Sequence, residues 1–178
     1  MQATLQSHDL LFFGTPFTPS FYQPYELAAQ KALSLVWSAR QALCAKESDA
    51  VRALTYRLKS PSSITAKLQR RGLPVTRQAA GMLRDIAGLR VVLNTTPQVY
   101  RFSQLLLRSP SIRLIDTKDY IASPKESGYR SLHLRLSVPV SLQAQELSVP
   151  VEIQLRTASM DVFASIEHSM CYKPYGLY

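Results

Sequence analysis

Two carboxylates stand among many cations in this sequence. Asp85 comes directly before the segment IAGLRVVLN, and Glu152 lies inside the segment SVPVEIQLRT. Oxygen ligands hold a hard cation such as Mg²⁺, while Lys and Arg hold the remaining oxygens of a polyphosphate. The residue types therefore suggest a site for a magnesium–polyphosphate complex, provided that the fold brings the two carboxylates together.

A second group of polar residues occurs in the segment YRLKSPSSITAK. Arg57 and Lys59 share one face of a predicted strand, and Lys67 lies on the helix predicted to follow it. Ser63 falls in the first turn of that helix, where backbone N–H groups attract anions. These residues predict a triphosphate cradle, although the sequence has no Walker motif GxxxxGK[ST].

Alternation places further polar side chains on one face of two predicted strands. The segment RSLHLRL turns three leucines to one side, and VEIQLRT turns its apolar residues to one side in the same way. The polar sides carry Tyr129, Ser131, His133, Arg135, Glu152, Gln154 and Arg156. An ordinary solvated face of an antiparallel sheet would show the same alternation. If the strands are neighbours, however, these side chains gather on one surface.

The elements that position these residues follow from hydrophobic periodicity. The pattern predicts a long amphipathic helix from Pro24 to about Lys46, and further helices over 60–72, from Thr96 and from Thr157. The last helix is expected to bury Met160, Phe163, Ala164 and Met170. Strands are expected in LTYRLK, AGLRVVLN, SIRLID, RSLHLRLSV and SVPVEIQLRT.

About five strands mixed with four or five helices predict an α/β (α+β) fold. The expected architecture is a single mixed β-sheet with helices packed mainly on one face. Residues 1–23, rich in Pro, Thr, Ser and Phe, are expected to form an N-terminal arm, and residues 24–178 a single domain.

Composition narrows the class of partner. The chain has 178 residues, 46% of them hydrophobic, which is enough for a core and argues against disorder. Its formal net charge of +9 favours anionic partners such as nucleotides or RNA. Cys44 and Cys171 match no metal-binding spacing and are expected to be reduced thiols. Without an apolar run of membrane-spanning length or a signal peptide, a cytoplasmic protein with no membrane partner is expected.

Four segments occur in an order that resembles the synthetase domain of RelA/SpoT-type alarmone enzymes: YRLKSPSSITAK, DIAGLRVV, DYIASPKESGYRSLH and VEIQLRTASMDVFASIEHSMCYK. The resemblance covers about Pro24 to Lys173 and looks most like a small alarmone synthetase. It implies a nucleotidyltransferase-like synthetase fold and a GTP pyrophosphokinase. Such an enzyme transfers pyrophosphate from ATP, with Mg²⁺, to the ribose 3′-hydroxyl of GDP or GTP, and makes ppGpp or pppGpp for the stringent response.

The resemblance also implies roles on the ATP side of the site. Arg57 and Arg90 would sandwich the adenine. Lys59, Ser63 and Lys67 would hold the ATP phosphates. Asp85 would bind Mg²⁺, and Glu152 would share the metal or take the proton from the attacking hydroxyl.

On the acceptor side, the resemblance implies that Tyr129 stacks on guanine. Further residues would line the acceptor phosphates or orient the site: Lys125, Arg130, His133, Gln154 and Arg156. Asp161 stands where relatives often carry Asn. An Asp can accept hydrogen bonds from the N1–H and N2–H edge of guanine, so guanine remains compatible with this position.

Alternatives remain open at this point. Some toxin members of the resembled family place pyrophosphate on the 3′ end of tRNA, and others use adenine nucleotides as acceptors. The basic cluster Lys67, Arg70, Arg71 and Arg77 suits tRNA as well as a nucleotide. A non-catalytic RNA- or nucleotide-binding module is a second alternative. Small alarmone synthetases continue with C-terminal helices that are missing here, so a homo-oligomer or an antitoxin partner is left undetermined.

Overall fold

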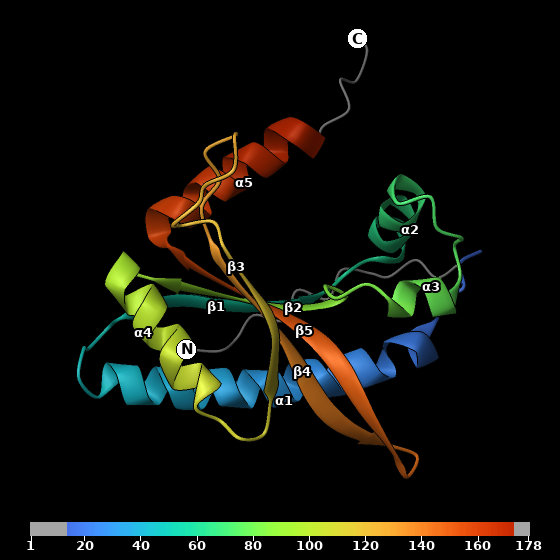
Figure 1. The fold of residues 1–178 in the computed structure, drawn as a ribbon, viewed down its shortest axis with the longest axis horizontal. Coiled ribbons are helices and arrows are strands. Elements are labelled where there is room, and N and C mark those ends of the chain that lie inside the picture. Colours follow the sequence, from blue (N-terminus) through green and yellow to red (C-terminus); the bar gives the residue numbers. More distant parts are fainter. Residues whose placement is uncertain (1–13, 173–178) are drawn as a thin grey trace.

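A computed structural model describes residues 14–172 and shows one five-stranded sheet (Figure 1). The strands lie in the order β1-β2-β5-β4-β3. Their bounds are β1 Val51–Leu58, β2 Ala87–Leu93, β3 Arg113–Asp119, β4 Leu132–Leu142 and β5 Gln145–Thr157. β2 and β5 run parallel, whereas the other neighbouring pairs are antiparallel. The predicted single mixed sheet is therefore confirmed.

Five helices accompany the sheet in the described part of the chain: α1 Pro19–Cys44, α2 Pro61–Arg70, α3 Arg77–Gly81, α4 Thr96–Leu107 and α5 Ala158–Tyr172. The long α1 crosses below the sheet and α4 packs beside it, so that these two helices cover one face (Figure 1). α2 and α5 rise at two separate ends of the other face. The five-residue α3 was not predicted. None of the helices in residues 14–172 is both long and apolar enough to cross a membrane.

Alternation along the strands separates the core from a polar face, as the sequence predicts. The apolar side chains of β4 and β5 are almost fully buried, with Leu132, Leu134, Leu136, Val151, Ile153 and Leu155 all at 3% exposure or less. The register then places His133 opposite Gln154, and Arg135 opposite Glu152. On the other side of β5, Gly88 pairs with Glu152 and Arg90 pairs with Gln154. The polar sides of β2, β4 and β5 therefore form one surface.

The long helix begins at Pro19, five residues earlier than the predicted Pro24. Both prolines suit a first helical turn, and sequence alone favours the second. The aromatic residues between them explain the earlier start: Phe21 and Tyr22 are buried, and the Tyr22 hydroxyl donates a 2.7 Å hydrogen bond to the Lys59 carbonyl. This packing offsets the backbone hydrogen bond that Pro24 cannot make inside the helix. Residues 1–13 lie outside the described part.

Helix α5 follows β5 without an intervening loop, and its burial differs from the prediction. Ala164 is buried as expected, but Phe163 is 41% exposed and Met160 is half-buried. The Phe163 ring lies over the loop before β4, where a Cβ added to Gly128 would meet it at 3.5 Å. Phe163 therefore covers a loop rather than the core. The side chain of Met170 lies outside the described residues.

Candidate active site

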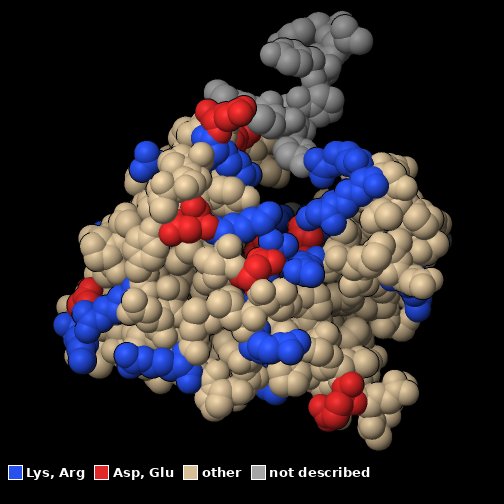
Figure 2. Space-filling view, viewed as in Figure 1, with Lys and Arg blue, Asp and Glu red and all other residues tan. Residues whose placement is uncertain are grey.

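The polar face of the sheet lies between α5 and α2. Figure 2 shows Lys and Arg side chains gathered over this region, with a few Asp and Glu side chains among them. The surrounding surface is mostly neutral in this view. Most of the side chains that the sequence proposes for a site belong to this face, and their contacts define it in detail.

Asp85 lies between the two lysines of the predicted phosphate cradle. Its Oδ2 atom accepts a 3.0 Å hydrogen bond from Nζ of Lys59 and a 2.6 Å hydrogen bond from Nζ of Lys67. Burial by itself would raise the pKa of Asp85, but the charges and hydrogen bonds of both lysines outweigh it and hold the pKa below its ordinary value. The carboxylate is therefore ionised at neutral pH, and it partly neutralises the two cations.

The second oxygen of Asp85 supports a metal site. Oδ1 is buried and has no hydrogen-bond partner among the described residues. No group of three or more His, Cys, Asp and Glu suited to a metal occurs in residues 14–172. Mg²⁺ nevertheless requires only one or two carboxylates from a protein when water and substrate phosphates complete its shell. The free oxygen of Asp85 thus fits a role as a ligand of Mg²⁺, with Glu152 as the candidate for a second carboxylate.

Glu152 belongs to a closed ring of five side chains. Arg156 Nη2 donates hydrogen bonds to Tyr129 Oη at 2.8 Å and to Gln154 Oε1 at 3.0 Å. Gln154 Nε2 donates to Glu152 Oε2 at 2.8 Å, and His133 Nδ1 lies 3.4 Å from Glu152 Oε1. Tyr129 Oη and His133 Nε2, 2.9 Å apart, close the ring. Because Tyr129 accepts from Arg156, its own hydroxyl proton can be donated to His133 Nε2, which leaves Nδ1–H directed at Glu152.

The surroundings of Glu152 favour its ionised form. Burial raises its pKa, but the hydrogen bond from His133, the charge that His133 carries when it is protonated, and the hydrogen bond from Gln154 outweigh burial and lower it. The negative charge of Asp85 by itself would raise the pKa of Glu152, which shows that the two carboxylates influence each other. A general base works best with a pKa near the working pH. A lowered pKa therefore suits metal binding better than proton abstraction.

The Tyr129 ring is more buried than a ring that stacks on guanine would need to be. The residue is 6% exposed, and its ring packs edge-on against Tyr120 and His133. Nζ of Lys125 lies 4.5 Å from the Tyr129 ring centroid and 5.0 Å from the Tyr120 centroid. Stacking of a base on Tyr129 therefore stays a prediction, and it requires Lys125 or the surrounding loop to move.

Arg57 and Arg90, the two predicted adenine contacts, lie on adjacent strands. Thr55 pairs with Arg90 and Arg57 pairs with Gly88, so the two arginines share the polar face diagonally. Arg57 is exposed, whereas Arg90 is half-buried and its Nη1 lies 3.3 Å from Oδ1 of Asp161. The arrangement can present two guanidinium planes to one purine.

Ser63 and Arg130 lie at the margin of this cluster. Ser63 is exposed in the first turn of α2, and its backbone N–H donates to Ser60 Oγ, the N-cap of the helix. It lies one turn from Lys67, so both can face the same phosphate group. Arg130 is exposed, and within residues 14–172 no hydrogen bond or ion pair joins it to the cluster. Its role in phosphate binding stays a prediction.

Three residues near the site, Tyr120, Asp116 and Arg84, were not singled out from the sequence. Tyr120 packs on Tyr129 and His133, and Asp116 on β3 lies 2.6 Å from Arg135 and 3.2 Å from Arg84. Alternation predicts that Arg135 lies on the polar face. The face on which Asp116 lies cannot be predicted in the same way, because the pairing of β3 with β4 shifts register between Leu114 and Asp116. Such an irregularity has no clear sequence signal.

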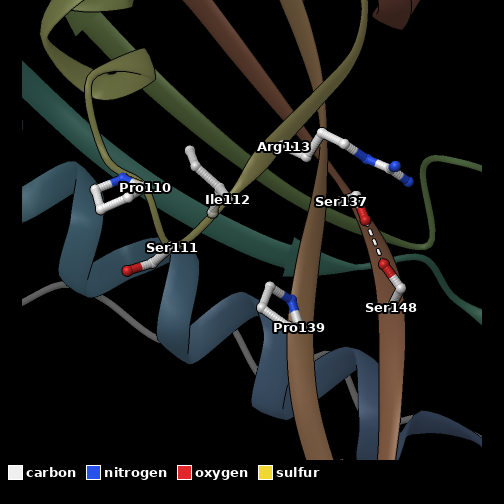
Figure 3. A pocket seen from close by; sticks show the side chains of 7 residues that line it. All are labelled: Pro110, Ser111, Ile112, Arg113, Ser137, Pro139 and Ser148. Carbon is white, nitrogen blue, oxygen red and sulfur yellow. Dashed lines mark hydrogen bonds between the residues drawn. The ribbon is translucent and has the colours of Figure 1, made fainter.

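A cavity of about 250 Å³ lies farther along the same strands, toward the β4–β5 hairpin (Figure 3). The segment Pro110–Arg113 forms one wall, and Ser137, Pro139 and Ser148 form the other, with a hydrogen bond between the two serines. The lining has one cation and no carboxylate, and none of the predicted site residues belongs to it. The cavity is therefore separate from the Asp85 and Glu152 cluster.

Comparison with known proteins agrees with this geometry. The RelA_SpoT family model, described as a region found in RelA / SpoT proteins, matches residues 56–176. GTP pyrophosphokinase YwaC of Bacillus subtilis is 41% identical over 118 residues, which are 66% of this chain and 56% of that protein. GTP pyrophosphokinase YjbM of the same organism is 37% identical over 123 residues, 69% of this chain and 57% of that protein. The chain thus spans little more than half the length of these curated relatives.

Solved structures give the same relationship. Small alarmone synthetase 1 from Bacillus subtilis, bound to its product pppGpp, superposes with a TM-score of 0.78 and 34% identity, over 89% of this chain and 81% of that chain. A GTP pyrophosphokinase family protein from Streptococcus pneumoniae has a TM-score of 0.77 and 33% identity, over 86% of this chain and 75% of that chain. Fold, sequence and site lead to one conclusion: the chain belongs to the RelA/SpoT family and is similar to its small alarmone synthetases.

Proposed function

We propose that the protein is a GTP pyrophosphokinase that transfers pyrophosphate from ATP to the ribose 3′-hydroxyl of GDP or GTP. The observation that carries this proposal is the placement of Asp85 and Glu152 on one polar face, each held among cations or hydrogen-bond donors. Its relatives named GTP pyrophosphokinase, and a structural relative that holds pppGpp, support the same reaction.

Charge neutralisation and positioning dominate a reaction of this type. Lys59 and Lys67 would hold the ATP phosphates, and Arg57 and Arg90 would stack on the adenine. Mg²⁺, held by Asp85 and Glu152, would neutralise charge on the transferred pyrophosphate. Both lysines contact Asp85, and ATP would draw them toward its phosphates.

The acceptor would lie on the Tyr129 side of the face. Tyr129 and His133 are joined to Glu152 through the ring of five side chains, so an acceptor bound there would have its hydroxyl near Glu152. A tRNA acceptor has less support. Arg77 belongs to the basic cluster that would suit tRNA, but its side chain donates hydrogen bonds to the Pro16 carbonyl and to the Thr18 hydroxyl.

An acceptor screen with labelled ATP tests the proposed function. The protein is incubated with Mg²⁺ and γ-labelled ATP, together with GDP, GTP, GMP, ADP or deacylated tRNA. Label is expected in GDP or GTP, and chelation of Mg²⁺ with EDTA should abolish the transfer. Label in tRNA alone would favour the toxin-like alternative. Absence of transfer to every acceptor, with retained nucleotide binding, would favour a binding module.

Tyr129→Ala separates acceptor binding from ATP binding. If the ring stacks on guanine, the acceptor KM should rise about ten- to hundredfold, while the ATP KM changes little. Tyr129→Phe keeps the ring and removes the hydroxyl that Arg156 and His133 contact, so it should retain most of the acceptor affinity. Steady-state kinetics measures both constants, and a melting curve shows that each variant is folded. Equal increases in both KM values would mean that Tyr129 only supports the loop.

A further inference from the structure

One oxygen of Asp161 contacts two guanidinium groups from different strands. Oδ1 lies 3.3 Å from Nη1 of Arg90 on β2 and accepts a 2.9 Å hydrogen bond from Nη1 of Arg156 on β5. The Arg156 side chain is 5% exposed, and the Arg90 side chain is 34% exposed. A single carboxylate thus lies between the ATP side and the acceptor side of the proposed site.

The two arginines are crowded enough to repel each other. Burial, and next the charge of Arg156, lower the pKa of Arg90, whereas the charge of Asp161 acts in the opposite direction. Arg156 is further fixed by its hydrogen bonds to Tyr129 and Gln154. If the negative charge between the arginines were removed, the half-exposed Arg90 would therefore be the one to move away.

The position of Asp161 is set by the fold. It lies in the first turn of α5, which begins at Ala158 directly after β5 ends at Thr157, so no loop separates it from Arg156. A carboxylate in the first turn is also favoured by the helix dipole. The backbone carbonyl of Asp161 accepts a 2.8 Å hydrogen bond from the Ser165 hydroxyl, one turn along α5. The carboxylate is thus presented from a fixed point to both guanidinium groups.

We infer that Asp161 is a positioning residue for ATP, because it holds Arg90 beside Arg156 in the orientation that stacks on adenine. This inference rests on the proposed function, in which Arg90 contacts the adenine. The role suggested by sequence, reading the guanine edge, affects the acceptor alone. The two roles therefore differ in which nucleotide loses affinity when Asp161 is changed.

A double-mutant cycle tests the inference through binding rather than turnover. Affinity for a non-hydrolysable ATP analogue, with Mg²⁺ and no acceptor, is measured by calorimetry for wild type, Asp161→Asn, Arg90→Ala and the double variant. Asn keeps an oxygen that Arg156 can donate to but removes the charge. Asp161→Asn should weaken binding of the analogue about tenfold, and it should add nothing in the Arg90→Ala background.

The control is Glu167→Gln. It also removes a carboxylate from α5, but at a position beyond the first turn of the helix. It should leave the affinity for the analogue unchanged. Wild-type affinity in Asp161→Asn, or a further loss in the double variant, overturns the inference. Unfolding of Asp161→Asn that is rescued in the double variant would support it, because Arg90 is then the source of the repulsion. Unfolding of both would contradict it. A wild-type protein that fails to bind the analogue contradicts the proposed function instead.

Discussion

Asp85→Asn is expected to lower kcat/KM by about a thousandfold or more while the protein stays folded. The amide can still accept hydrogen bonds from Lys59 and Lys67, but it cannot supply the negative oxygen that Mg²⁺ requires. In the absence of Mg²⁺ the same variant should bind an ATP analogue as tightly as wild type or more tightly. The reason is that the two lysines no longer share a counter-charge.

Two measurements on one variant make this result specific. Transfer of labelled pyrophosphate gives kcat/KM, and calorimetry in EDTA gives the metal-free affinity for the analogue. Glu47→Gln serves as a matched control, because Glu47 also pairs with a cation, Arg101, but does so between the α1–β1 connection and α4, away from the polar face. Near-wild-type turnover in Asp85→Asn would show that Asp85 does not hold the metal.

Phe102→Ala is expected to lower the free energy of unfolding by about 3–5 kcal/mol. Phe102 is fully buried on α4, within the hydrophobic core shared by α1 and the apolar face of the sheet. Its removal leaves a cavity in a closely packed region, in addition to the lost transfer free energy of the ring. Urea denaturation followed by circular dichroism measures the change.

Leu107→Ala on the same helix is the comparison for this prediction. Leu107 is 36% exposed and lies at the end of α4, so truncation should cost less than about 1.5 kcal/mol. Similar losses in the two variants would contradict this prediction, because burial of Phe102 would then contribute no more to stability than a partly exposed side chain at the end of the helix. A large difference confirms that the layer of α1 and α4 is held by packing on the sheet.

Local patterns in the sequence were enough for the strands and their faces and for the described helices other than the short α3. Leu132 and Leu134 alternate with His133 and Arg135, and the structure buries the first pair and turns the second to the polar face. The Ser60-Pro61 pair marks the start of α2, where Ser60 caps the helix. These features depend on neighbouring residues only, so periodicity and capping chemistry reveal them.

Local patterns were insufficient where side chains compete for the same space. Phe163 has helical spacing with Met160, yet it covers the loop at Gly128. Pro24 resembles a helix start, yet aromatic packing extends α1 back to Pro19. In both cases a tertiary contact outweighs the local preference, and no local window of sequence contains both partners of that contact.

The sequence alone therefore determined which residues could form the site and on which side of each strand they lie. Only the tertiary structure decided that β2 and β5 are parallel neighbours, which places Gly88 beside Glu152 and Arg90 beside Gln154. It also decided that Asp161 lies between Arg90 and Arg156. The physical reason is that alternation depends on backbone geometry within a strand, whereas pairing between distant strands depends on burying their apolar faces together.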